Sequence, residues 1–282
     1  MTFRDEAVYT LLKLVPKNAL SRAVGAAVRA PAPAPVTRAV IRGFSALYGV
    51  DVSEAERPAA EYSTFGDFFT RRLKAGARAI APGEAVLASP ADGALGQCGA
   101  ITSGECLQAK GKTYAAAELV GGDADGADYA AGSFATVYLA PHNYHRVHAP
   151  LGGTITGFHY APGQLWPVNR IGVARVEKLF AVNERLTTFL DTPAGRCAVV
   201  MVGATCVGRM RALYADVVTN ATQKREARRE RFERPIPVEK GAELGIFEMG
   251  STVVMLFERQ LALEPGLETG APVRMGQKLG AF

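Results

Sequence analysis

Cysteine is scarce in this chain, and the few that occur are not spaced for a metal or a disulfide framework. There are four cysteines in 282 residues, and no two stand at Cys-x-x-Cys spacing. This scarcity excludes a small disulfide-stapled domain and a cysteine zinc site. We therefore interpret them as small buried apolar side chains of a protein in a reducing compartment. They are Cys98, Cys106, Cys197 and Cys206.

Long apolar runs are also missing. A membrane-spanning helix needs roughly 20 consecutive apolar residues. The best candidate, residues 198–207, is short and is interrupted by Gly203 and Thr205, so it predicts a buried strand. A signal peptide is not expected either, because Asp5 and Glu6 stand where such a peptide carries basic residues.

The excess of positive charge is confined to one segment. The formal net charge is +5, and residues 1–48 carry seven basic and two acidic residues, so the remainder of the chain is balanced. Apolar residues of this segment recur at helical spacing in three sets, which Pro16 and the proline-rich residues 30–35 separate. We expect three amphipathic helices. Two interpretations stay open: the helices bind an anionic membrane surface, or they cover the core.

From about residue 62 the pattern changes to short apolar runs bounded by glycine, proline and aspartate, which is typical of strands. Residues 240–247 and 275–282 share the pattern x-Gly-x-x-Leu-Gly-x-Phe, which predicts a turn glycine followed by a closely packed strand. The sequence thus predicts an α+β fold. We expect a helical region over residues 1–61 and a core of curved antiparallel hairpins over residues 62–282.

A charge run occupies residues 224–231. Nucleic-acid binding is the sharper interpretation, but glutamates are interspersed and Phe232 is the one nearby aromatic residue that could stack on a base. A solvated loop or short helix is favoured, and no nucleic-acid partner is expected.

The Gly250-Ser251 bond lies in a strand-like run, residues 247–254. A glycine carbonyl followed by a serine hydroxyl is suited to attack by the chain on its own backbone, because glycine does not crowd the carbonyl. Serine is a weak nucleophile and needs a base, commonly a histidine oriented by a carboxylate. His142, His145 and His148 occur in residues 138–150, and Asp92 follows Pro90-Ala91.

Together these segments resemble the bacterial phosphatidylserine decarboxylases, self-processing enzymes that make their own pyruvoyl cofactor. Residues 65–69, 178–185 and 202–204 extend the resemblance over nearly the whole chain. Met249 stands where the family usually has leucine, which is a volume-conserving replacement.

The resemblance implies a role for each matching residue. Asp92 and His148 act together as the general base for self-cleavage between Gly250 and Ser251. Ser251 becomes a covalent pyruvoyl group, and the chains 1–250 and 251–282 stay together. His145 is the acid–base group that acts on the substrate.

The implied reaction is decarboxylation of phosphatidylserine to phosphatidylethanolamine, through a Schiff base with the pyruvoyl group. The resemblance further implies a homodimer and, together with the basic N-terminal helices, a peripheral position on the cytoplasmic side of the cell membrane.

Two alternatives from other functional classes stay open. A serine hydrolase could use Asp92, His148 and Ser251 as a standing triad, although no Gly-x-Ser-x-Gly elbow surrounds the serine. A peripheral membrane adaptor without enzymatic activity would bind lipid through its N-terminal helices and would not be cleaved. A metal site on the three histidines is disfavoured, because His145 would point away from the other two on a strand. No metal is expected.

Overall fold

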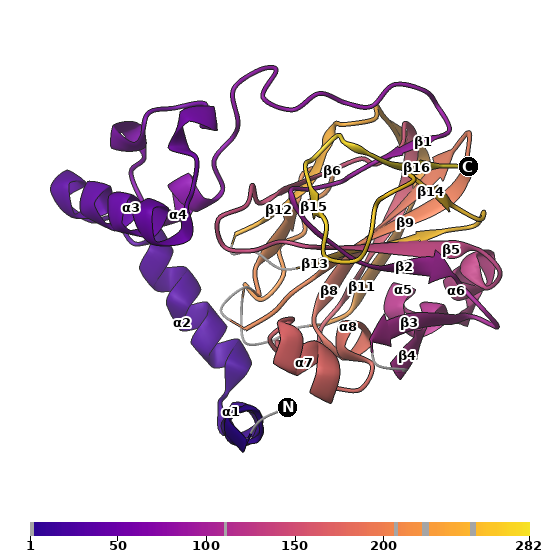
Figure 1. The fold of residues 1–282 in the computed structure, drawn as a ribbon, viewed down its shortest axis with the longest axis horizontal. Helices are drawn as coiled ribbons and strands as arrows, with labels where there is room; N and C mark the ends of the chain where they lie inside the picture. Colours follow the sequence, from indigo (N-terminus) through magenta and orange to yellow (C-terminus); the bar gives the residue numbers. More distant parts are fainter. Residues whose placement is uncertain (1–2, 110–111, 206–207, 222–225, 249–251) are drawn as a thin grey trace.

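A helical arm lies beside a β-rich core (Figure 1). The computed structural model describes residues 3–109, 112–205, 208–221, 226–248 and 252–282. The arm consists of α1 (Phe3–Leu14), α2 (Lys17–Arg29) and α3 (Ala34–Tyr48), followed by the short α4 (Phe65–Phe69). The three predicted helices are confirmed, and the breaks fall at Pro16 and at the proline-rich segment as expected, because proline cannot continue a helix.

An eight-stranded antiparallel sheet forms the centre of the core. This architecture confirms the predicted α+β class with antiparallel strands. In spatial order its strands are β11 (Arg228–Val238), β7 (Gly153–Ala161), β8 (Arg185–Thr192), β9 (Gly195–Val202), β13 (Thr252–Phe257), β5 (Ser133–Tyr138), β2 (Gly93–Ala100) and β15 (Pro272–Val273).

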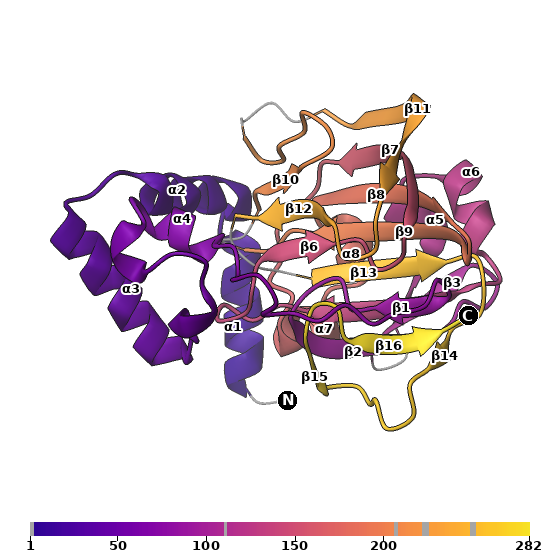
Figure 2. The ribbon, with the colours of Figure 1, turned by 90° about the horizontal axis from the view of Figure 1, so that it is seen from above.

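Both faces of the sheet are buried. Successive side chains of a strand point to opposite faces, so each strand contributes to two apolar clusters. In β13, Val253, Met255 and Phe257 belong to one apolar cluster, whereas Val254 and Leu256 belong to another. The first cluster is completed by two small antiparallel sheets, and the second by short helices and a hairpin (Figure 2).

The small sheets are β1–β16–β14 and β10–β12–β6. Their bounds are β1 (Val86–Ala88), β16 (Lys278–Ala281), β14 (Ala262–Leu263), β10 (Met210–Ala212), β12 (Glu243–Phe247) and β6 (Arg146–His148). The other elements are the hairpin β3 (Glu105–Ala109) and β4 (Lys112–Ala115), the helices α5 (Ala116–Val120), α6 (Asp123–Gly126), α7 (Arg170–Arg175) and α8 (Leu179–Val182), and the 3₁₀ turns η1 (Val52–Glu54), η2 (Ala59–Glu61) and η3 (Ala127–Tyr129).

The repeated glycine pattern behaves as predicted. Gly241 and Gly276 turn the chain with φ of +85° and +84°, and β12 and β16 follow them. The second glycine of each repeat packs closely: a Cβ on Gly245 would lie 2.8 Å from the Arg211 carbonyl oxygen, and one on Gly280 would lie 2.3 Å from that of Ala262. Side chains at either position would push the paired strands apart.

The expectation for the charge run was wrong in its described part. Residues 228–231 are neither loop nor helix but begin β11, the exposed edge strand of the large sheet. Strand pairing with β7 decides the conformation here, and charged side chains suit an edge that must not pair with other molecules. The strand predicted within residues 198–207 is confirmed by β9, which ends at Val202.

One apolar cluster of the helical part spans the predicted boundary at residue 61. Ile41 and Val50 pack with Tyr62 and Phe68, so apolar contacts cross residue 61. The division of the chain at residue 61 stays a prediction. Among the described residues, no helix combines the length and apolar character required to cross a bilayer.

Candidate active site

The end of the central sheet faces the arm, and the predicted cleavage point adjoins it in the chain. β13 begins at Thr252, which pairs with Tyr138 of β5 and with Val202 of β9. Thr252 is completely buried, and Ala94 of β2 continues the same row beside Tyr138. Met249, Gly250 and Ser251 themselves lie outside the described residues.

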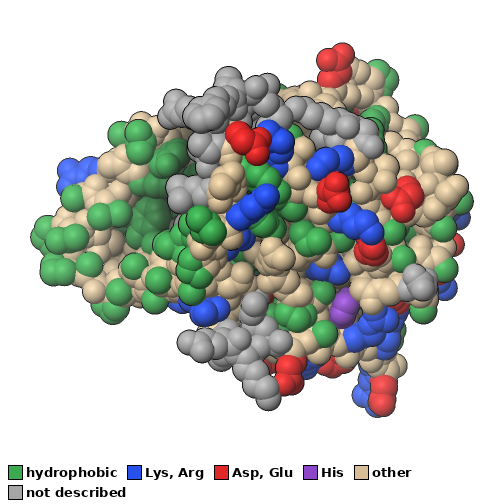
Figure 3. Space-filling view, turned by 90° about the horizontal axis from the view of Figure 1, so that it is seen from below, with side chains coloured by type: hydrophobic (Ala, Val, Ile, Leu, Met, Phe, Trp, Pro, Cys, Tyr) green, Lys and Arg blue, Asp and Glu red, His purple; other side chains and the backbone are tan. Residues whose placement is uncertain are grey.

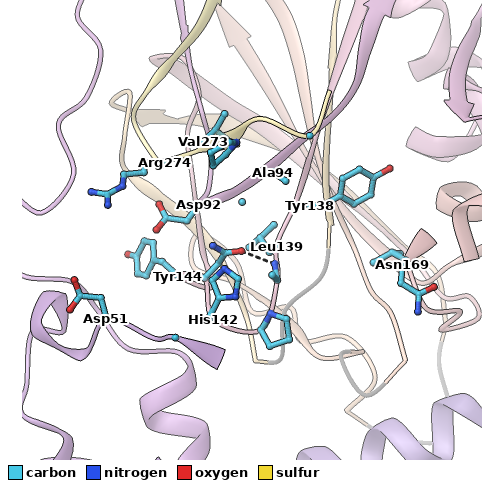
Figure 4. A pocket seen from close by; sticks show the side chains of 18 of the residues that line it. Asp51, Asp92, Ala94, Tyr138, Leu139, His142, Tyr144, Asn169, Val273 and Arg274 are labelled. Atoms are coloured by element: carbon cyan, nitrogen blue, oxygen red, sulfur yellow. Dashed lines mark hydrogen bonds between the residues drawn. The ribbon is translucent and has the colours of Figure 1, made fainter. Parts of the chain in front are cut away.

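A cavity of about 840 Å³ opens at this end of the sheet. Its wall contains Asp92, the loop from Tyr138 to Tyr144, and residues after α3 such as Asp51. Asp92, Tyr144 and His142 lie on one side of the view, and Tyr138 lies on the other (Figure 4). The cavity therefore lies between the core and the end of the arm.

The Asp92 carboxylate is held by three donors. The Arg78 guanidinium donates from Nε to Oδ1 at 2.9 Å and from Nη2 to Oδ2 at 2.6 Å, and the Met275 amide donates to Oδ1 at 2.8 Å. Arg78 also binds both carboxylate oxygens of Glu54, at 2.9 and 2.7 Å. These two carboxylates raise the pKa of Arg78, so the guanidinium is a permanent cation that keeps Asp92 in a fixed orientation.

His148 has a defined tautomer because of its partners. Its Nδ1 lies 2.7 Å from the Gly241 carbonyl oxygen, which can only accept, so Nδ1 carries the hydrogen. Nε2 lies 3.0 Å from the Tyr144 hydroxyl, which donates to it in the neutral ring. Burial lowers the pKa of His148, and the imidazole is therefore neutral with its lone pair on Nε2.

His145 directly precedes β6, which pairs with β12, the strand that ends shortly before the cleavage point. Its carbonyl accepts from the Phe247 amide at 2.9 Å, and its ring stacks on Phe69 with 4.0 Å between centroids. Nε2 donates to the Pro141 carbonyl at 3.2 Å, which leaves the lone pair on Nδ1, and among the described residues Nδ1 has no partner. Complete burial lowers the pKa of His145 to about 3, so this ring is also neutral.

Comparison with known proteins decides the family. A family model described as phosphatidylserine decarboxylase matches residues 65–281. The chain belongs to the phosphatidylserine decarboxylase family. Proteins named phosphatidylserine decarboxylase proenzyme are 54% identical in Anaeromyxobacter sp., over 98% of both chains, and 49% identical in Myxococcus xanthus, over 99% of both. A Brevibacillus brevis protein of the same name is 42% identical over 95% of both chains.

In this decarboxylase-family chain, Asp92 and His148 are neighbours but not hydrogen-bond partners. The His148 amide donates to the Pro90 carbonyl at 2.8 Å, close to Asp92 in the chain, while the two side chains bind Arg78 and Tyr144 respectively. The catalytic roles of Asp92, His145, His148 and Ser251 stay predictions.

Several cavity residues were missed by sequence reasoning. Arg71, Arg78 and Glu54 carry no distinctive spacing, and they come together only because the segment after α3 folds against Asp92. Tyr144 could have been found, since it stands directly before His145 in the histidine-rich segment. His159, outside this site, donates from Nδ1 to the Val120 carbonyl at 2.9 Å.

The remaining candidates for metal or redox chemistry are accounted for within the described residues. Cys106 and Cys197 are buried and Cys98 is half-buried, and all three are free thiols, while Cys206 lies outside the described part of the chain. Burial raises the pKa of the Cys98 thiol and of the Cys106 thiol, the latter to about 12. In the ranges that the structure describes, no three metal-binding side chains converge.

Proposed function

We propose that this chain decarboxylates phosphatidylserine to phosphatidylethanolamine, and that it first cleaves itself between Gly250 and Ser251 to make a pyruvoyl group. The observation that carries the proposal is membership of the decarboxylase family over nearly the full chain, with relatives named proenzymes. Two further observations agree with it: Asp92 and His142 line the cavity at the end of the sheet, and the His145 carbonyl accepts from the amide of Phe247, shortly before the proposed cleavage point.

The surroundings of Thr252 suit a pyruvoyl group on the preceding residue. Thr252 is fully buried at the start of β13, an interior strand of the sheet, and its neighbour Tyr138 lines the cavity. A reactive ketone on the residue before Thr252 would be joined to a strand whose neighbour lines the cavity. When formed, the group supplies an electron sink for the charge that carbon dioxide leaves behind.

Self-cleavage needs a base, and we assign it to Nε2 of His148. Ser251 gives up its hydroxyl proton and attacks the Gly250 carbonyl carbon, which exchanges the amide for an ester. Loss of the serine α-proton then breaks the bond between Cβ and Oγ of residue 251. This elimination frees the Gly250 carboxylate and leaves a dehydroalanine. Water converts the dehydroalanine to the ketone, and ammonia leaves. Asp92, fixed by Arg78, supplies the negative charge that stabilises a protonated His148.

His145 is assigned to proton transfer at the substrate. Its Nδ1 carries a lone pair without a protein partner among the described residues, and stacking on Phe69 fixes the ring. Burial keeps this imidazole neutral in the free protein, so proton uptake at Nδ1 requires that negative charge developing on the bound substrate raise its pKa again.

The arm supports a peripheral position on a membrane. The residues of α2 that are buried against the protein are Lys17, Ser21 and Gly25, so its apolar stripe is turned elsewhere. Large apolar side chains are exposed along the arm, and hydrophobic atoms gather on it in Figure 3. Covering the core therefore does not account for these residues, which are Leu14, Leu20, Val36, Val40, Leu47 and Tyr48. An anionic bilayer matches both the apolar surface and the basic charge.

The deciding experiment is the intact mass of the purified, reduced protein. We expect two chains, one ending at Gly250 and the other beginning with a pyruvoyl group at position 251. The Ser251→Ala variant should remain a single chain without decarboxylase activity. A single wild-type chain with an intact serine would favour the hydrolase or adaptor instead, and cleavage of Ser251→Ala would contradict the mechanism. The homodimer stays a prediction.

A further inference from the structure

The cavity contains three arginines, and only one of them lacks a carboxylate partner. Arg78 is bound to Glu54 and Asp92, and Arg274 lies 3.6 Å from Glu54. Arg71 forms no ion pair with any described residue, although it lines the same cavity. Its positive charge is therefore available to a ligand.

Arg71 is also buried, which makes the missing partner costly. Its exposed fraction is 4%, Nη2 donates to the His142 carbonyl at 3.3 Å, and the guanidinium carbon lies 5.1 Å from the centre of the Phe68 ring. Nε and Nη1 have no hydrogen-bond partner among the described residues. A buried cation with unused donors is unfavourable unless an anion binds it, so the site is built for a negative group.

Basic side chains outnumber acidic ones in a second pocket beside Arg71. Arg71 also borders a smaller pocket of about 270 Å³, whose wall holds four arginines and two acidic residues. These residues are Glu56, Arg57, Asp67, Arg71, Arg72 and Arg146, together with Thr70. An anion near Arg71 would thus meet an excess of basic side chains on the side of the smaller pocket, whereas the arginines of the large cavity are balanced by Asp51, Glu54 and Asp92.

The cavity wall next to the arm is flanked by apolar side chains. Gly49 and Asp51 line the cavity, and their chain neighbours Leu47, Tyr48 and Val52 are 77%, 43% and 44% exposed. A ligand entering here would meet apolar surface outside and a guanidinium inside. This arrangement matches an amphipathic molecule that enters the cavity with its anionic group first and leaves its acyl chains on the apolar surface at the rim.

We infer that Arg71 binds the phosphodiester of the phospholipid headgroup. This inference rests on the proposed function, because the phosphodiester is that of the proposed substrate. The phosphate is preferred over the serine carboxylate on chemical grounds. Decarboxylation removes the negative charge of the carboxylate, so an arginine bound to that group would stabilise the ground state more than the transition state. The phosphate keeps its charge from substrate to product and can stay bound throughout.

The test is calorimetric titration of the purified protein, cleaved or uncleaved as it is obtained, with two soluble probes. Glycerophosphoethanolamine carries the phosphodiester without a carboxylate, and serine carries the carboxylate without a phosphate. Arg71→Met should weaken binding of glycerophosphoethanolamine about tenfold or more, as expected for loss of charge-assisted hydrogen bonds, and should leave serine binding unchanged. Arg71→Lys, which keeps the charge but not the planar fork, should fall between. Arg234→Met, at an exposed position of β11, is the matched control and should bind as the wild type does.

Several results would overturn the assignment: equal affinity of the wild type and Arg71→Met for glycerophosphoethanolamine, no binding of that probe by the wild type, or a larger loss for serine. If Arg71→Met fails to fold, the affinity of Arg71→Lys for glycerophosphoethanolamine decides. It should be lower than that of the Arg234→Met control, and equal affinity would overturn the assignment. Failure of the proposed function is seen separately, as an uncleaved wild-type chain or no release of carbon dioxide, and the titration still reports on Arg71.

Discussion

At the residue scale, two buried histidines three positions apart have lone pairs on different nitrogens. His148 presents Nε2 because Gly241 fixes its Nδ1 hydrogen, and His145 presents Nδ1 because Pro141 fixes its Nε2 hydrogen. Both rings are neutral because burial lowers their pKa. The backbone, rather than a carboxylate, selects the tautomer in each case, so two separate proton-transfer roles are chemically reasonable.

We predict that the two histidines separate maturation from turnover. His148→Ala should leave the chain uncleaved, because Ser251 loses its base. His145→Ala should still yield two chains but lose decarboxylation about a hundredfold or more, the scale typical of a lost acid–base group. Intact mass and carbon dioxide release measure the two effects.

The control for this pair is His159→Gln, which alters a buried histidine on β7 that bonds to the Val120 carbonyl, and this variant should mature and turn over normally. Normal cleavage of His148→Ala would remove it from the proposed role, and full turnover by His145→Ala would do the same for His145.

Residue identity could be predicted from the sequence only where a motif marked it. Asp92 and His148 were found through a family resemblance, but their actual partners, Arg78 and Tyr144, were not. An arginine such as Arg71 looks like any surface charge in a sequence. Its burial follows from how residues 49–78 cross the end of the sheet, and no local pattern contains that information.

At the element scale, α2 reaches the segment just before the cleavage point. Arg29, at the end of α2, lies 3.0 Å from the Glu248 carboxylate, and Arg209 and Arg211 bind the same group at 2.7 and 3.0 Å. Glu248 is buried, so three cations from two parts of the molecule fix one side chain. The arm therefore helps to position the chain that leads toward Gly250.

We predict that Arg29→Met slows self-cleavage several-fold without abolishing it, because two of the three cations on Glu248 remain. A time course of chain separation after synthesis would measure the effect. Arg22→Met, which lies on the same helix but binds Asn220 at 3.3 Å, is the matched control and should mature at the wild-type rate. An unchanged rate for Arg29→Met would show that the arm does not position the cleavage segment.

The elements themselves were more predictable than their environment. Proline positions were sufficient to divide the arm into its three helices. The face that each helix buries was not evident, because α2 buries Lys17, Ser21 and Gly25 rather than its apolar residues. The charged start of β11 was misread for a related reason: pairing with β7 overrides local preference for a loop.

At the scale of the whole molecule, apolar exposure is concentrated on the arm, and the cavity lies beside the end of α3. A bilayer that covers the arm would bring lipid headgroups to Gly49 and Asp51, next to the cavity. Membrane binding and substrate entry would then use the same surface, and the core with its sheet would stay in water.

We therefore predict that replacing exposed apolar residues of the arm weakens binding to anionic vesicles. Leu14 and Leu47 are 79% and 77% exposed, and burying a leucine contributes roughly 1.5–3 kcal/mol. The double variant Leu14→Gln/Leu47→Gln should lose at least tenfold in vesicle affinity, measured by co-sedimentation with phosphatidylserine-containing vesicles.

Leu107→Gln, at a 43% exposed position on β3 across the core from α3, is the matched control (Figure 1). Raising the salt concentration should weaken the remaining binding, because basic side chains contribute through screened electrostatics. Vesicle affinity equal to that of the wild type would show that the apolar surface of the arm serves another contact.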